Sequence, residues 1–195
     1  MNQRGSVAFN VLKGVNPSIG MFRWDGDSRQ LTPLGLPGTP AADGLTFLPP
    51  RSVFAGTAIN NSSEVAFGQN VKDAAGKGLG LGAFFMGRDG VTRTVALPGQ
   101  ALPDGGTVRT PYVESLNDAG VVALVAQVNP GGAWLPYLWE NGTITAINPH
   151  IAGGGQIAGN SAAVYVNNHD ASALVVAPRG GPGPFGLYRW SAGQL

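Results

Sequence analysis

The stretch MNQRGSVAF at residues 1–9 recurs as INNSSEVAF at 59–67, LNDAGVVAL at 116–124 and VNNHDASAL at 166–174. Each stretch has an apolar residue, an Asn, a small or turn-forming residue, and finally a small and a large apolar residue. Asn2, Asn60, Asn117 and Asn167 are separated by 58, 57 and 50 residues. Periods of this length are typical of propellers and other stacked-repeat folds, so the repeat predicts the architecture and leaves the activity open.

A second recurring feature follows each Asn stretch. Alternating apolar residues lead into a Gly-containing turn, in FRWDG at 22–26, FMGRDG at 85–90, YLWENG at 137–142 and LYRWSAG at 187–193. This pattern predicts a strand and a tight hairpin. In this alignment Trp24, Trp139 and Trp190 share one position, which Gly87 takes in the second copy, and we expect the tryptophans to pack between neighbouring sheets.

The rest of each unit predicts two further strands. Short strands are expected at 30–32, 91–95 and 143–147. Pro/Gly-rich loops follow at 36–44, 97–106 and 148–155, and strands at 52–59, 109–116 and 161–166 lead to the next Asn. Four strands per unit, joined by hairpins and one long loop, is the layout of a propeller blade. We therefore predict an all-β, propeller-like array of four-stranded antiparallel blades.

Composition agrees with many short strands. The chain has 31 Gly and 15 Pro among 195 residues, and no window shows helical spacing of apolar residues over the length of a helix. We expect one repeat domain over 1–195, with repeats at 1–58, 59–115, 116–165 and a partial repeat at 166–195. About three and a half repeats predict an incomplete, open propeller, which self-associates through its open blade edges or belongs to a longer array.

Charge and cysteine content narrow the classes of partner. Charged residues make up 12% of the chain, and 12 basic against 11 acidic residues give a net charge of +1. With no basic stripe we expect no nucleic-acid partner. The sequence has no Cys, no apolar run long enough for a membrane span and no visible signal peptide.

The Asn-x-x-Gly-x-x-x-Phe line of Asn2, Gly5 and Phe9, with the Tyr/Phe-x-Trp hairpin and the Pro-Gly to Asp-Gly loop, resembles a bacterial family. It is similar to the choice-of-anchor tandem-repeat proteins, and the likeness covers nearly the whole chain. The resemblance implies a secreted or surface-displayed bacterial protein of largely uncharacterised function. It supplies no catalytic residue.

Candidate site residues come from position rather than from a motif. The recurring Asn residues are expected to shape turns, because Asn bonds its own backbone two residues on. The long loop recurs in each unit, so stacking would gather its copies on one rim, where binding is common. The polar residues on or just after these loops are Asp43, Arg51, Asp104, Arg109 and His150. We expect ligand contacts there, and no metal site or cofactor.

Two functions fit these features. The first is a non-enzymatic extracellular or cell-surface module for binding or scaffolding, with an unknown ligand or surface partner. The second is a propeller-type hydrolase or lyase acting on sugars, with carboxylates from different blades converging on the substrate. Convergence of two or more acids would favour the enzyme.

Overall fold

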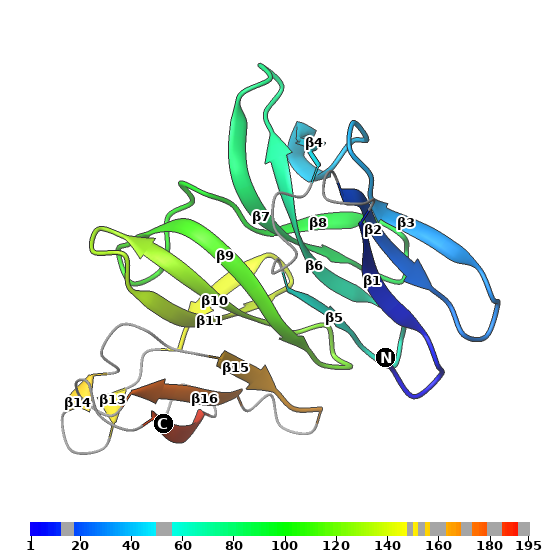
Figure 1. The fold of residues 1–195 in the computed structure, drawn as a ribbon. Helices are drawn as coiled ribbons and strands as arrows, with labels where there is room; N and C mark the ends of the chain where they lie inside the picture. Colours follow the sequence, from blue (N-terminus) through cyan, green and yellow to red (C-terminus); the bar gives the residue numbers. More distant parts are fainter. Residues whose placement is uncertain are drawn as a thin grey trace.

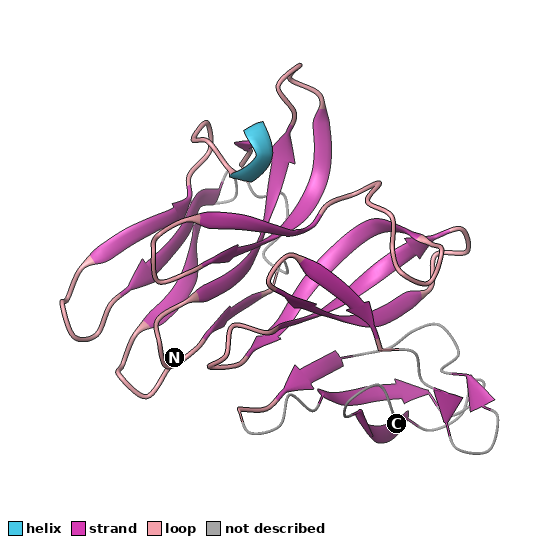
Figure 2. Cartoon of the chain, turned by 180° about the vertical axis from the view of Figure 1, so that it is seen from behind, coloured by secondary structure: helices cyan, strands magenta, loops and turns pink. Residues whose placement is uncertain are grey.

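The computed structural model describes residues 1–12, 18–49, 56–147, 150–151, 155–156, 163–168, 173–178 and 185–190. The described chain is all-β, with antiparallel sheets and a single short 3-10 turn, η1 (Ala42–Gly44), as Figure 2 shows. The prediction of an all-β chain is confirmed. Figure 1 shows four main sheets that follow one another in chain order.

The sheets differ in strand number within the described residues. The first is β1 (Val7–Leu12), β2 (Ser18–Trp24) and β3 (Leu31–Gly35). The second contains β4 (Thr46–Phe47), β5 (Thr57–Ile59), β6 (Val65–Lys72), β7 (Gly78–Met86) and β8 (Thr92–Ala96). The third has β9 (Thr107–Leu116), β10 (Val122–Asn129), β11 (Trp134–Glu140) and β12 (Thr143–Ala146).

The C-terminal part contains two smaller sheets. A two-residue pair, β13 (His150–Ile151) and β14 (Gly155–Gln156), precedes the fourth main sheet. That sheet is β15 (Ala163–Val166), β16 (Ala173–Pro178) and β17 (Phe185–Trp190). Of the described sheets, the third alone has four strands, because the second also includes β4 and the first and fourth have three. The strand before each Asn was expected to close its own unit, and this was wrong: β5 pairs with β6, β9 with β10 and β15 with β16 of the following unit.

Pairing register corrects the alignment of the second hairpin. Trp24 pairs with Val7 and Trp139 pairs with Val122, each five residues after its Asn. The residue that pairs with the equivalent Val65 is Met86. The sequence alignment with Gly87 was therefore wrong by one residue.

The fourth sheet departs from this register as well. Trp190 pairs with Ala173, which lies six residues after Asn167, so it does not share the position of Trp24 and Trp139.

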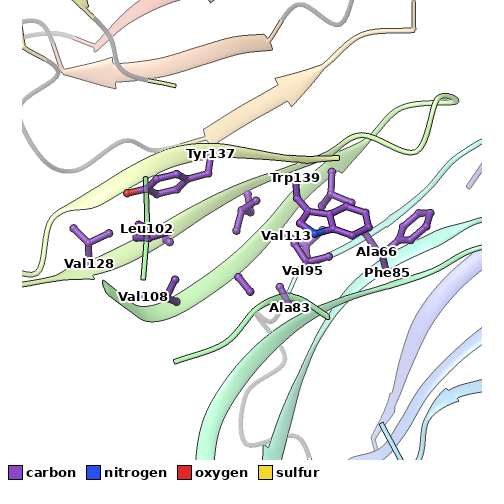
Figure 3. Close-up of a cluster of buried hydrophobic side chains, with 14 residues drawn as sticks. Ala66, Ala83, Phe85, Val95, Leu102, Val108, Val113, Val128, Tyr137 and Trp139 are labelled. Carbon is purple, nitrogen blue, oxygen red and sulfur yellow. The ribbon is translucent and has the colours of Figure 1, made fainter. Parts of the chain in front are cut away.

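Alternate residues of each sheet point to opposite sides and join two different cores. Val65, Phe67, Phe84 and Met86 pack towards the first sheet, in a core with Met21 and Phe47. Ala66 and Phe85 belong to the next core, with residues of the third sheet (Figure 3). A third core joins Val121, Ala123 and Leu138 to Val164 of the fourth sheet. Each main sheet is thus packed on the next one along the chain.

The strand that comes just before each Asn contacts the corresponding strand of the neighbouring sheet: β5 contacts β9, and β9 contacts β15. Gly56, just before β5, shows how closely: its φ is +72°, and a Cβ there would lie 2.0 Å from the carbonyl oxygen of Val113. Only Gly fits this approach. The close approach fixes the spacing of the second and third sheets.

Candidate functional site

The Asn turns, defined as residues 2–6, 60–64 and 117–121, share one internal geometry. Oδ1 of each Asn accepts the backbone N–H groups two and four residues later, at 2.8–3.1 Å. The residue three after the Asn has positive φ in every turn: Gly5 at 75°, Ser63 at 59° and Gly120 at 84°. The predicted role of Asn2, Asn60 and Asn117 in shaping turns is confirmed.

The same Asn side chains also connect the copies. Nδ2 of Asn2 donates to the carbonyl oxygen of Asn60 at 2.8 Å, Nδ2 of Asn60 donates to that of Asn117 at 3.0 Å, and Nδ2 of Asn117 donates to that of Asn167 at 3.0 Å. Asn60 and Asn117 are each only 3% exposed. We call this series the Asn ladder. Sequence reasoning missed it, because a bond between copies leaves no local signal.

A second row of bonds runs beside the ladder. The residue after each Asn uses its side-chain Oδ1 to accept the backbone N–H of its counterpart in the preceding copy: Asn61 from Gln3, Asp118 from Asn61, and Asn168 from Asp118, at 2.8–3.0 Å. Asn, Asp and Asn all offer this acceptor. The junction between copies therefore repeats along the described chain.

A polar cleft lies between the second and third copies. Its volume is about 760 Å³, and its walls include the turn after β7, strand β8, Gly120 of the third Asn turn and the turn after β11. The charged residues lining it are Asp43, Glu64, Arg88, Asp89 and Arg93. Its apolar wall is formed by Phe85 and Trp139, whose ring centroids are 5.3 Å apart.

Ion pairs hold two of the carboxylates in this cleft. Arg93 donates to Asp89 through two bonds of 2.5 and 3.2 Å, and this lowers the pKa of Asp89 to about 2. Glu64 accepts a 2.6 Å bond from Asn60 and lies 3.7 Å from Nε of Arg88. Both carboxylates therefore already have cationic or amide partners within the protein.

The wall of the cleft also carries one hydroxyl without a partner. Thr94 lines the cleft, and its buried Oγ1 has no hydrogen-bond partner. A buried polar atom of this kind costs free energy unless something bonds it.

The predicted loop residues fall in different places. Asp43 lines the cleft, and Asp104 lines a hollow of about 260 Å³ beside Asn129 and Leu135. Asp104 accepts a 2.8 Å bond from the hydroxyl of Tyr137, whose pKa is raised by burial and by Asp104. The two loops have matching backbone bonds, for example Gly38 to Phe47 and Gly99 to Val108, but their carboxylates do not meet in one hollow.

Two of the remaining predicted residues lie in described strands. Arg109 is exposed on β9, and His150 contributes backbone to β13, paired with Gln156. Arg51 lies outside the described residues. Among the described residues, then, Asp43 is the only predicted site residue in the cleft.

One further carboxylate was not predicted. Glu114 is on β9, between the paired residues Val113 and Ser115, and its partial burial raises its pKa. It does not line the cleft that holds Glu64 and Asp89. The acid with the raised pKa, Glu114, and the acid with the lowered pKa, Asp89, are thus in separate places.

The described residues contain neither a cluster of metal-binding side chains nor a helix that could span a membrane. No group of three or more His, Cys, Asp or Glu side chains in that part of the chain is arranged to hold a metal ion. None of its helical segments has the length and apolar character needed to cross a bilayer.

Comparisons with known proteins place the chain in a family without giving it an activity. No curated protein matches the sequence. Among solved structures, TolB from Acinetobacter baumannii aligns with 96% of this chain and 50% of its own, at 10% identity and a TM-score of 0.38. The chain thus spans about half the length of that protein. A family of unknown function, DUF7453, matches residues 1–134, and the chain belongs to this family.

Proposed function

We propose that the chain is a non-enzymatic, propeller-like repeat module, displayed outside the cell or on its surface, which serves as a scaffold and binds a polar ligand. Its units are blade-like sheets within one repeat domain over 1–195, and the four-stranded third sheet is the template for the others. The ligand surface is the cleft between the second and third copies.

The observation that carries the proposal is the Asn ladder. Three successive Asn turns donate from Nδ2 to the next Asn carbonyl oxygen, so the junctions have the same chemistry in each described copy. Bonds of this kind, largely shielded from water, hold neighbouring sheets in a fixed relation. A rigid row of sheets is suited to presenting loops and clefts for binding.

The chemistry of the cleft supports binding of a polar ligand. The partly exposed guanidinium groups of Arg88 and Arg93 provide hydrogen-bond donors. Trp139 and Phe85 form an apolar wall beside them. A few polar groups set against an aromatic wall is a usual arrangement in ligand sites.

Sugar hydrolysis is less well supported by the same cleft. The mechanism needs one carboxylic acid that is protonated near neutral pH, together with a second, ionised carboxylate. Asp89 has a pKa of about 2, and Glu64 is engaged by Asn60 and Arg88. The carboxyl group of Asp89 is therefore not suited to donate a proton at neutral pH.

The test is an NMR titration of the isotopically labelled protein with a panel of oligosaccharides and short peptides. We expect shifts of the amides at 87–90, 119–120 and 141–142, loss of these shifts in Arg88→Ala, and retention in the control Arg4→Ala. Mass spectrometry should show the ligand unchanged. Cleavage of a panel sugar that depends on Glu64 or Asp89 would establish the enzyme instead, and absence of shifts in the cleft would refute its binding role.

A further inference from the structure

One side of the first sheet exposes apolar residues. Cross-strand pairs share a side of a sheet, so Val7, Trp24 and Leu31 lie together, and Phe9 and Phe22 lie beside them. The two phenylalanine rings stack with centroids 6.3 Å apart. Trp24 is 38% exposed and Leu31 is 54% exposed. We call these five residues the leading face.

The same positions are buried in the next two copies. In the second sheet Val65, Phe67 and Phe84 are 0% exposed and Met86 is 7% exposed, because the first sheet covers them. In the third sheet the counterparts are covered by the second, and their exposures are 0–3%: Val122, Leu124, Tyr137 and Trp139. The leading face therefore has the composition and pairing of a surface that another sheet covers.

The Asn ladder has an open end on the same copy. The carbonyl oxygens of Asn60 and Asn117 each accept an Asn Nδ2 from the copy before, in addition to a bond within their own turn. Within the described chain, the carbonyl oxygen of Asn2 accepts only the N–H of Gly5. Gln3 is exposed, and it occupies the position of Asn61 and Asp118, whose side-chain oxygens accept a backbone N–H from the preceding copy. An apolar face and a row of acceptors thus lie at one end of the row of sheets.

We propose that a second copy of this chain docks on the leading face through its fourth sheet, β15–β17, and so repeats the junction that joins the sheets within the chain. The fourth sheet lies at the other end of the row in Figure 1. Its strand β15 packs on β9 of the third sheet, as β9 packs on β5 of the second, so the fourth sheet is the element in line to cover a following sheet.

Such an interface is head-to-tail, because the two surfaces in contact are different. Head-to-tail contacts close into a ring when the rotation permits and otherwise form open fibres. Two chains with four main sheets each would give eight, and propellers close with about four to eight blades. A ring of two chains is therefore the expected product.

The test begins with the mass of the 195-residue protein. Light scattering over a range of concentrations should give a mass of about twice 19.9 kDa at tens of micromolar. Trp24→Glu should raise the dissociation constant at least tenfold, and it should leave the circular dichroism spectrum unchanged because Trp24 is already exposed. Val91→Glu is the matched control: Val91 is 51% exposed in a turn outside the leading face, and its dimer should persist.

Cross-linking fixes the direction of docking. The natural chain has no Cys, so a short bis-maleimide can react with cysteine thiols only where Cys has been introduced. Since residues 61, 118 and 168 contact their counterparts in the copy before, we expect Gln3→Cys protein to cross-link with Asn168→Cys protein. Open fibres with this cross-link would equally support the docking.

Two results would overturn the proposal. An association free energy of about 5 kcal/mol is enough to form dimers at 100 µM. A protein that is still monomeric at this concentration would therefore show that the leading face has no such partner. Cross-linking of Gln3→Cys protein with itself, but not with Asn168→Cys protein, would show face-to-face pairing instead. The proposal rests on sheet stacking alone, so either result leaves ligand binding in the cleft to its own test.

Discussion

Replacement of Asn117 by Ala tests whether the Asn ladder stabilises the fold. Asn117 is 3% exposed, and its side chain makes three bonds: it accepts from Ala119 and Val121 and donates to the carbonyl oxygen of Asn167. The N–H of Val121 is buried, so it would lose its partner without gaining water. With about 1–3 kcal/mol for each buried group left unsatisfied, we expect a loss of about 3 kcal/mol in the free energy of unfolding.

Asn2 provides a control at a less buried place, because it makes the three corresponding bonds and one longer bond, from Nδ2 to Oγ of Ser63 at 3.3 Å. Its Oδ1 accepts two N–H groups and its Nδ2 donates to Asn60, but the turn is partly open to water. Asn2→Ala should cost about 1 kcal/mol, since water can replace the lost partners. Urea unfolding followed by tryptophan fluorescence gives both free energies, provided that the slopes agree.

Asn117→Asp separates the two roles of the side chain. It keeps an oxygen for the turn but lacks the Nδ2 donor, and it places a carboxylate near the carbonyl oxygen of Asn167. If Asn117→Asp is as stable as the natural protein, the bond between copies contributes nothing. If Asn117→Ala and Asn2→Ala cost the same within 0.5 kcal/mol, burial of the ladder has no energetic role, and the reasoning fails.

Three further predictions concern local contacts. Gly56→Ala should lower the free energy of unfolding by more than about 3 kcal/mol, because the new Cβ would lie 2.0 Å from a neighbouring carbonyl oxygen. Gly76 also has positive φ but has nothing within 4 Å of such a Cβ, so Gly76→Ala should cost about 1 kcal/mol. Equal melting temperatures of the two variants would contradict this. Tyr137→Phe should cost about 1 kcal/mol in urea unfolding by removing one hydroxyl bond, and a neutral result would assign that bond no net value. The Asp89 carboxyl should titrate at about 2 by NMR, and its pKa should return towards the ordinary value in Arg93→Gln. Because the folded-state pKa is lowered, the contribution of Asp89 to stability is present above the ordinary carboxyl pKa and is lost as the pH falls towards 2. An unshifted titration would refute the ion pair.

Local features were predictable from the sequence because they depend on neighbours in the chain. Asn followed by a turn residue and two apolar residues predicts an Asx-type turn before a strand, and the structure shows it at Asn2, Asn60 and Asn117. Alternating apolar residues with Gly-containing turns predicted antiparallel hairpins, and β2–β3, β7–β8 and β11–β12 pair in this way.

Features that depend on register or on contact between copies were not predictable. The position of Met86 was missed because the turns after the equivalent residues differ in length: Trp24 is paired with Leu31, Met86 with Thr92 and Trp139 with Ile144. A gap of one residue in such a turn moves every side chain to the other side of the sheet. Alignment of the Gly-containing turns therefore placed Gly87, and not Met86, at the position of Trp24 and Trp139.

The ladder and the cleft illustrate two different uses of the repeat. Where the copies agree, at the Asn and the acceptor after it, their side chains bond to each other and hold the sheets together. Where they differ, side chains remain for other contacts: the cross-strand partner of Phe85 is Arg93, whereas the corresponding residues of the first and third sheets are Thr32 and Thr145.

The ion pair of Arg93 with Asp89 therefore depends on a position at which the second copy differs from the other two, and it lies in the cleft. The agreement between copies thus specifies the architecture, and the differences between them specify the chemistry of the cleft. For this reason the sequence pattern that predicted the fold best said least about the site.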